Sequence, residues 1–67
     1  MKKNFRIINT SDGSFENDII EVDLYYLLMS LSIDWHNTKL YLDELVVKPG
    51  YLILKSGEYE ITMREIL

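Results

Sequence analysis

The sequence of 67 residues contains no cysteine, one proline, one histidine and three isolated glycines. Without cysteine the chain has neither disulfides nor thiolate metal sites. A domain of this size buries only about 60% of the surface that its unfolded chain exposes, so its stability must come from packing or from a partner subunit. One histidine is too few for the usual zinc site, which takes three or four protein ligands dominated by His and Cys. The separated glycines form no loop that could bind a nucleotide phosphate.

Long apolar segments are also missing. The longest uncharged apolar run, residues 24–33, is about half the length that spans a bilayer and includes two serines. The basic residues at the N-terminus are not followed by the apolar segment of a signal peptide. We therefore expect a soluble, cytoplasmic protein with no membrane partner. The hydrophobic fraction of 48% excludes disorder and predicts one folded domain over residues 1–67.

Charge is distributed unevenly along the chain. Residues 1–11 have a net charge of +3, residues 12–34 have a net charge of −6, and the whole chain has a net charge of −4. An acidic segment attracts basic partners and repels free nucleic acid. We expect another protein with a basic surface as the partner, and no direct binding of nucleic acid.

Turn and strand signals in the first third of the chain predict a β-hairpin. Residues 4–9 are rich in β-forming side chains and stop before Asp12-Gly13, a pair typical of tight turns. A second strand is predicted over residues 15–22. Residues 16–18 have poor β propensity, so in the alternative interpretation they extend the loop.

An apolar helix is predicted over about residues 23–33, with Asp23 as its N-terminal cap. One face follows the i, i+3, i+4, i+7 spacing of an amphipathic helix, and a second apolar set occupies much of the other side. The first face consists of Leu24, Leu27, Leu28 and Leu31. A domain this small cannot bury both sides, so one should pack on a sheet and the other should contact something else. The adjacent Tyr25 and Tyr26 cannot both point inward.

The remaining sequence predicts an antiparallel β-meander packed on the helix, and hence an α+β fold. After a loop over residues 34–37, residues 38–48 form one strand, or two strands broken at Asp43-Glu44. Strands over residues 51–55 and 58–64 follow the Pro-Gly and Ser-Gly turns, and the last alternates cleanly between apolar and polar side chains.

No group of residues predicts catalysis or metal binding. The acidic loop over residues 12–23 matches part of a calcium-binding EF-hand loop, but Asn17 replaces its glycine and Asp23 its long terminal glutamate. Nucleophilic catalysis would need His36 to activate a hydroxyl such as that of Ser30 or Ser32, which belong to the predicted helix. We therefore expect no catalytic residue, no cofactor and no metal, and we expect that the protein is not an enzyme.

The aromatic residues point to a protein-binding site. Tyrosine and tryptophan are preferred interface anchors because they are large, rigid and polar at the tip. The expected site combines aromatic anchors, the only histidine and a border of carboxylates: Tyr25, Asp34, Trp35, His36, Tyr41, Asp43 and Glu44. Tyr41 and Asp43 are expected to share a strand face because side chains two apart point the same way. Two interpretations of Trp35 stay open, as an interface anchor or as a core residue.

Three functions remain open at this point. The first is a small non-catalytic protein-binding module; its composition is typical of phage-encoded inhibitors of host enzymes and defence nucleases, although no motif identifies such a family. The second is a nucleic-acid mimic that occupies the basic groove of a DNA- or RNA-binding protein. Its carboxylates would be Glu16, Asp18, Glu21, Asp23, Asp43, Glu44, Glu58 and Glu60. The third is a small structural subunit of a homodimer.

Overall fold

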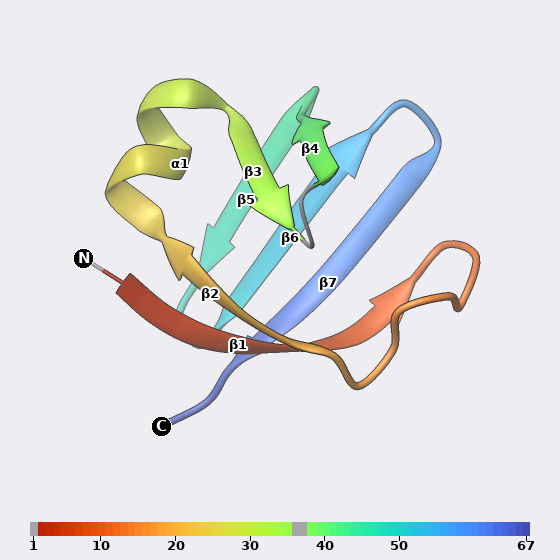
Figure 1. The fold of residues 1–67 in the computed structure, drawn as a ribbon, viewed down its shortest axis with the longest axis horizontal. Helices are drawn as coiled ribbons and strands as arrows, with labels where there is room; N and C mark the ends of the chain where they lie inside the picture. The colour runs from red at the N-terminus through yellow and green to blue at the C-terminus, as the bar shows by residue number, and fades with distance from the viewer. Residues whose placement is uncertain (1, 36–37) are drawn as a thin grey trace.

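The computed structural model describes residues 2–35 and 38–67, without the side chains of Trp35 and Thr38. It has one short helix, a five-stranded antiparallel sheet and a two-stranded sheet, which confirms the predicted α+β fold (Figure 1). In chain order the elements are β1 (Lys2–Thr10), β2 (Ile19–Asp23), α1 (Leu24–Ser30), β3 (Ser32–Trp35), β4 (Thr38–Tyr41), β5 (Glu44–Lys48), β6 (Tyr51–Ser56) and β7 (Tyr59–Glu65).

The large sheet has the strand order β2-β1-β7-β6-β5. The predicted C-terminal meander supplies β5, β6 and β7, and β1 joins the N-terminal hairpin to it by pairing with β7. The register between β1 and β7 shifts between Ile7 and Asn9, which is the signature of a β-bulge. A bulge bends its strand, and Figure 1 shows β1 curving along its length while α1, β3 and β4 lie together on one side of the sheet.

The core lies on the inner face of the curved sheet. Alternate residues of β1, β6 and β7 point inward, so that Ile7, Leu52 and Met63 meet across neighbouring strands and have no exposed surface. Leu27 of α1 and Ile33 of β3 close the same cluster from the other side. The helix and the small hairpin therefore each contribute side chains to a core that the sheet mostly supplies.

The N-terminal hairpin has a longer loop than a tight turn. β2 begins at Ile19, so the strand predicted from residue 15 is wrong over residues 15–18 and the alternative interpretation is confirmed. In this loop the carboxylate of Asp12 accepts hydrogen bonds from the backbone N–H (3.0 Å) and the hydroxyl (2.6 Å) of Ser14. Such local bonds compete with strand pairing. The hydroxyl of Ser14 also lowers the pKa of Asp12.

The helix begins where the sequence predicts and ends three residues early. The carboxylate of Asp23 accepts from the backbone N–H groups of Tyr25 (3.1 Å) and Tyr26 (3.2 Å), which confirms the cap. Leu31 ends the helix in the left-handed conformation, with φ of 50°. The next residues pair with β4, so Asp34 and Trp35 belong to a strand and not to the predicted loop.

Residues 38–48 contain two strands, which confirms the second of the two predicted alternatives. The break falls at Leu42 and Asp43, one residue before the predicted position. The backbone N–H of Asp43 donates to the Lys55 carbonyl (2.8 Å), and its carboxylate accepts from the backbone N–H of Gly57. Asp43 thus fixes the start of β5 against the turn between β6 and β7.

Candidate functional site

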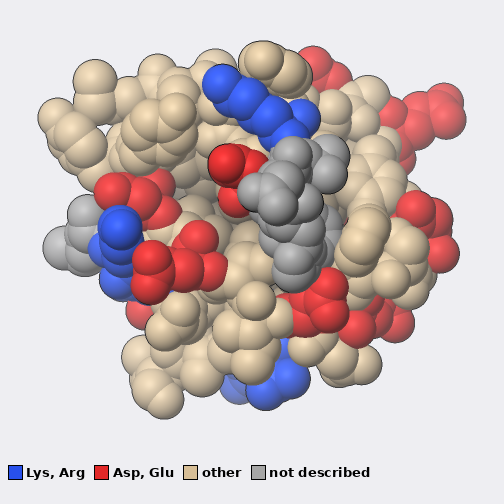
Figure 2. Space-filling view, in the orientation of Figure 1, with Lys and Arg blue, Asp and Glu red and all other residues tan. Residues whose placement is uncertain are grey.

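Helix α1 exposes most of its apolar side chains. Its seven residues include no charged side chain, and only Leu27 is buried. The other large side chains of the helix and its C-terminal cap are half exposed or more, apart from the partly buried Leu24: Tyr25 70%, Tyr26 56%, Leu28 58%, Met29 71% and Leu31 50%. Figure 2 shows the surface over α1, at the upper left, as a continuous area without Lys, Arg, Asp or Glu.

The first of the two predicted apolar faces is only half buried. Leu24 and Leu27 contact the core, whereas Leu28 and Leu31 of the same predicted face are exposed. The helix has about two turns, which is too short for a face of four leucines to lie along the sheet. Both Tyr25 and Tyr26 face outward, where the sequence required only one to do so.

Tyr41 of β4 is a further exposed aromatic side chain, at 69%. Tyr41 pairs with Ser32 across the small hairpin, and the backbone N–H of Leu42 donates to the carbonyl of Leu31 (3.0 Å). The end of β4 is therefore fixed to the end of the helix. We define the helix patch by its six exposed side chains: Tyr25, Tyr26, Leu28, Met29, Leu31 and Tyr41.

Charges of both signs lie beside the helix patch on the small hairpin. Asp34 of β3 pairs in register with Lys39 of β4, and both are exposed. The Lys39 ammonium group lies 5.5 Å from the centre of the Tyr41 ring, within reach of a cation–π interaction. Asp34 thus lies near Tyr26 of the patch, since both line one cavity, and Lys39 adds a positive charge beside it.

A small acidic cavity of about 140 Å³ adjoins the patch at Tyr26. Its apolar lining includes Leu27 and Ile33 of the core. Three acidic residues also line it, Glu21, Asp23 and Asp34. The cavity suits a side chain with an apolar stem and a positive tip.

Asp43 and Glu44 have local roles in the sheet. Asp43 bonds to the turn at Gly57, and the carboxylate of Glu44 lies 3.7 Å from the Lys55 ammonium group. The predicted common strand face of Tyr41 and Asp43 is wrong, because β4 ends at Tyr41 and strand alternation stops there. The structure assigns neither carboxylate to the border of the helix patch.

Two predicted site residues lie outside what the structure describes. Trp35 is the last residue of β3, but its side chain and the whole of His36 are not among the described residues. The serines considered as partners of His36 have structural bonds: the hydroxyl of Ser30 donates to the carbonyl of Tyr26 (2.8 Å), and that of Ser32 donates to Ser30 (3.2 Å).

Sequence reasoning missed four members of the patch, namely Tyr26, Leu28, Met29 and Leu31. A usable signal was present, because a helix without any charged residue in so small a domain must expose apolar surface. The length of the helix decides which leucines are exposed. This length depends on the pairing of β3 with β4, which the local sequence does not predict.

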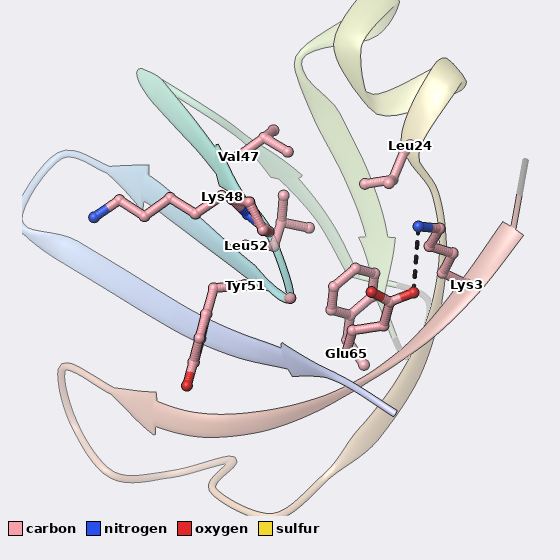
Figure 3. Close-up of a pocket in the computed structure, with 10 residues that line it drawn as sticks. Lys3, Leu24, Val47, Lys48, Tyr51, Leu52 and Glu65 are labelled. Carbon is pink, nitrogen blue, oxygen red and sulfur yellow. Dashed lines mark ion pairs between the residues drawn. The ribbon is translucent and has the colours of Figure 1, made fainter. Parts of the chain in front are cut away.

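A second cavity, of about 340 Å³, lies at the open end of the curved sheet (Figure 3). Phe5, Leu24, Val47 and Leu52 supply apolar wall, and the ammonium group of Lys3 lies 3.3 Å from the carboxylate of Glu65 beside them. Across the described ranges, no cluster of three or more His, Asp or Glu side chains could hold a metal. This cavity can accept an apolar group.

The helix among the described residues is too short to cross a membrane. Comparison of the chain with protein-family models, with curated proteins and with solved structures finds no match.

Proposed function

We propose that the protein is a non-catalytic binding module that holds another protein through the helix patch. The observation that supports this most directly is the exposure of five apolar side chains from one uncharged helix and its C-terminal cap. Contiguous apolar surface of this kind on a small protein marks an interaction site, because its hydration is unfavourable until a partner covers it.

The geometry of the patch favours a partner with an apolar groove. Tyr25, Leu28 and Met29 stand at positions i, i+3 and i+4, so they lie on one side of the helix. Helices that bind in grooves present anchors at this spacing. Tyr and Met are also enriched at protein interfaces, Tyr for its rigid contact area and Met for its adaptable shape.

The small acidic cavity adds a charge requirement for the partner. A lysine or arginine beside the partner's groove could reach Asp34 while its apolar stem contacts Ile33. A cytoplasmic enzyme or nuclease with basic residues around its substrate site would meet both requirements. Inhibition or regulation of such an enzyme is the mode of action that we propose.

The arrangement of carboxylates gives mimicry of nucleic acid less support. Of the residues proposed to imitate phosphates, Glu21 lies 3.7 Å from Lys2, and Glu44 lies 3.7 Å from Lys55. Asp23 and Asp43 accept hydrogen bonds from backbone N–H groups. Carboxylates with partners inside the protein are less available to a basic groove, so we retain the apolar patch as the binding surface.

Capture from a native lysate, followed by affinity measurement with the purified partner, tests the proposal. The double variant Leu28→Lys/Met29→Glu keeps the net charge and should weaken binding by roughly 30-fold or more, since anchor residues contribute at least about 2 kcal/mol. Its melting temperature should stay unchanged because both side chains are exposed. The matched control is Ile8→Thr, which removes an exposed apolar side chain from β1. Equal affinity of the double variant and the control would refute the proposal.

A further inference from the structure

The two edge strands of the large sheet, β2 and β5, differ in what they offer to another strand. Within the described ranges, no strand pairs with the outer side of either one. An unpaired edge is a template for strand addition unless charges, proline or a bulge protect it. The sequence of each edge therefore decides what can bind there.

The hairpin geometry fixes which backbone groups of β5 point outward. Lys48 and Tyr51 flank the two-residue turn Pro49-Gly50, where Gly50 has φ of 79°. Residues that flank such a turn exchange hydrogen bonds with each other, and bonded residues alternate along the strand. Val46 thus bonds to β6, while the N–H and C=O groups of Leu45 and Val47 face the outer edge.

The side chains of β5 complement a second copy of the same strand. In an antiparallel pair centred on Val46, each Leu45 lies opposite the other copy's Val47, so the outward backbone groups meet in hydrogen-bonded pairs. Each Glu44, which lies 3.7 Å from Lys55 of its own chain, then also lies opposite the other copy's Lys48. Opposite charges in this position stabilise a sheet. The strand is self-complementary in backbone, apolar contact and charge.

Neighbouring registers lose these contacts. A pair centred on Val47 would set Leu45 opposite Pro49, which has no N–H to donate. A pair centred on Leu45 would set Val47 opposite Asp43, whose N–H already donates to Lys55 (2.8 Å). The register centred on Val46 is therefore favoured over both.

The inner face of β5 gives a further reason for pairing. Val47 aligns with the buried Leu52 on the inner face, yet it remains 51% exposed at the mouth of the larger cavity, across from Leu24 (Figure 3). A second β5 would cover Val47 with the other copy's Leu45 and extend the apolar face of the sheet. A similar pairing on β2, centred on Glu21, would instead oppose two carboxylates.

We infer that two copies of this chain associate through their β5 edges into a continuous antiparallel sheet with two-fold symmetry, in the register centred on Val46. The residues of this surface are distinct from those of the helix patch. Symmetry makes each contact occur twice, so the two pairs of Glu44 and Lys48 both contribute.

Sedimentation velocity over concentrations from about 1 to 500 μM tests the inference. The wild type should show a concentration-dependent dimer. Lys48→Glu and Glu44→Lys should each raise the dissociation constant by about tenfold, because like charges then lie opposite each other at both pairs. An equimolar mixture of the two variants should form a heterodimer of wild-type affinity, because every opposed pair again joins unlike charges.

Two further variants separate this contact from misfolding and from the helix patch. Val47→Pro removes an outward N–H without removing a bond to β6, so it should abolish the dimer while the circular dichroism spectrum is retained. Leu28→Lys/Met29→Glu should leave the dissociation constant unchanged. A wild type that is monomeric throughout, a mixture without preferred heterodimers, or a dimer lost with the helix double variant would each overturn the inference.

Discussion

In β1, β6 and β7 the inward side chains Ile7, Leu52 and Met63 have no exposed surface, whereas Tyr25 and Met29 of α1 are 70% and 71% exposed. Both regions are rich in apolar residues, so composition does not distinguish them. The difference lies in geometry, because alternate residues of three neighbouring strands share one inner face, while a helix of two turns can direct only one or two side chains into the core.

This comparison separates the residues that stabilise the fold from those available for binding. Burying an apolar side chain stabilises a protein by about 1.5–3 kcal/mol, and the sheet places most of its large side chains in that position. The exposed side chains of α1 contribute little of this kind. They are therefore free to be selected for contact with a partner, and their substitution should cost binding more than stability.

The largest expected effect comes from two adjacent leucines of the helix. Leu27→Ala should lower the free energy of unfolding by about 2–5 kcal/mol, because Leu27 is 1% exposed and its removal leaves a cavity. Leu28→Ala should change it by less than about 0.5 kcal/mol, because Leu28 is 58% exposed. Both variants retain the helix propensity of the site, so urea unfolding measures burial directly. Equal losses would show that the helix patch is part of the core.

A smaller effect is expected at the N-terminal end of the helix. The backbone N–H of Tyr26 is the main cause that lowers the pKa of Asp23 from its ordinary value of 3.8. A lowered folded-state pKa means that the charged cap stabilises the protein above the unfolded pKa and that this stabilisation is lost as pH falls through the folded pKa. Asp23→Ala should lower the melting temperature by roughly 5 °C at neutral pH, and the difference should become smaller in acid as the charge of Asp23 is lost.

The control for this pH dependence is Asp23→Asn, which keeps a capping oxygen but does not titrate. Its melting temperature should lie between those of the wild type and Asp23→Ala at neutral pH. The contribution of the cap in this variant should stay constant as pH falls. If Asp23→Ala differs from the wild type equally at every pH, the charge of Asp23 has no part in capping the helix.

The parts of the fold that sequence predicts are those with a local cause. Strands β6 and β7 are predicted within one residue because Gly50 and Gly57 take the positive φ that tight turns require, and in β7 because apolar and polar side chains alternate. The cap at Asp23 is predicted for the same reason, since it acts on N–H groups two and three residues away.

The parts that sequence does not predict depend on distant residues. Ile33 continues the apolar pattern of the predicted helix, but Ser32 and Ile33 pair with Tyr41 and Leu40 and so belong to a strand. Asp43 resembles an interface carboxylate in sequence, yet it bonds to Gly57, which is 14 residues away. For the candidate site, Tyr25, Tyr41 and Asp34 lie on or beside the helix patch, while Asp43 and Glu44 belong to the sheet.

The smallest expected effect concerns Leu31, where the two regions meet. Leu31 has φ of 50° and ψ of 35°, a left-handed conformation that is unfavourable for a side chain with a Cβ atom and is usually occupied by glycine at the end of a helix. Its side chain is also 50% exposed, so little burial offsets this strain. Leu31→Gly should therefore raise the free energy of unfolding by about 0.5 kcal/mol while weakening capture of the partner.

A gain in stability with a loss of binding would show that leucine is retained at this position for contact, because strain that does not help folding persists where function requires it. Leu31→Asn is the matched control, since asparagine tolerates the left-handed conformation but offers no apolar contact. It should bind as weakly as Leu31→Gly. If both variants unfold more easily than the wild type in urea, Leu31 stabilises the fold, and the helix patch ends at Met29 and Tyr41.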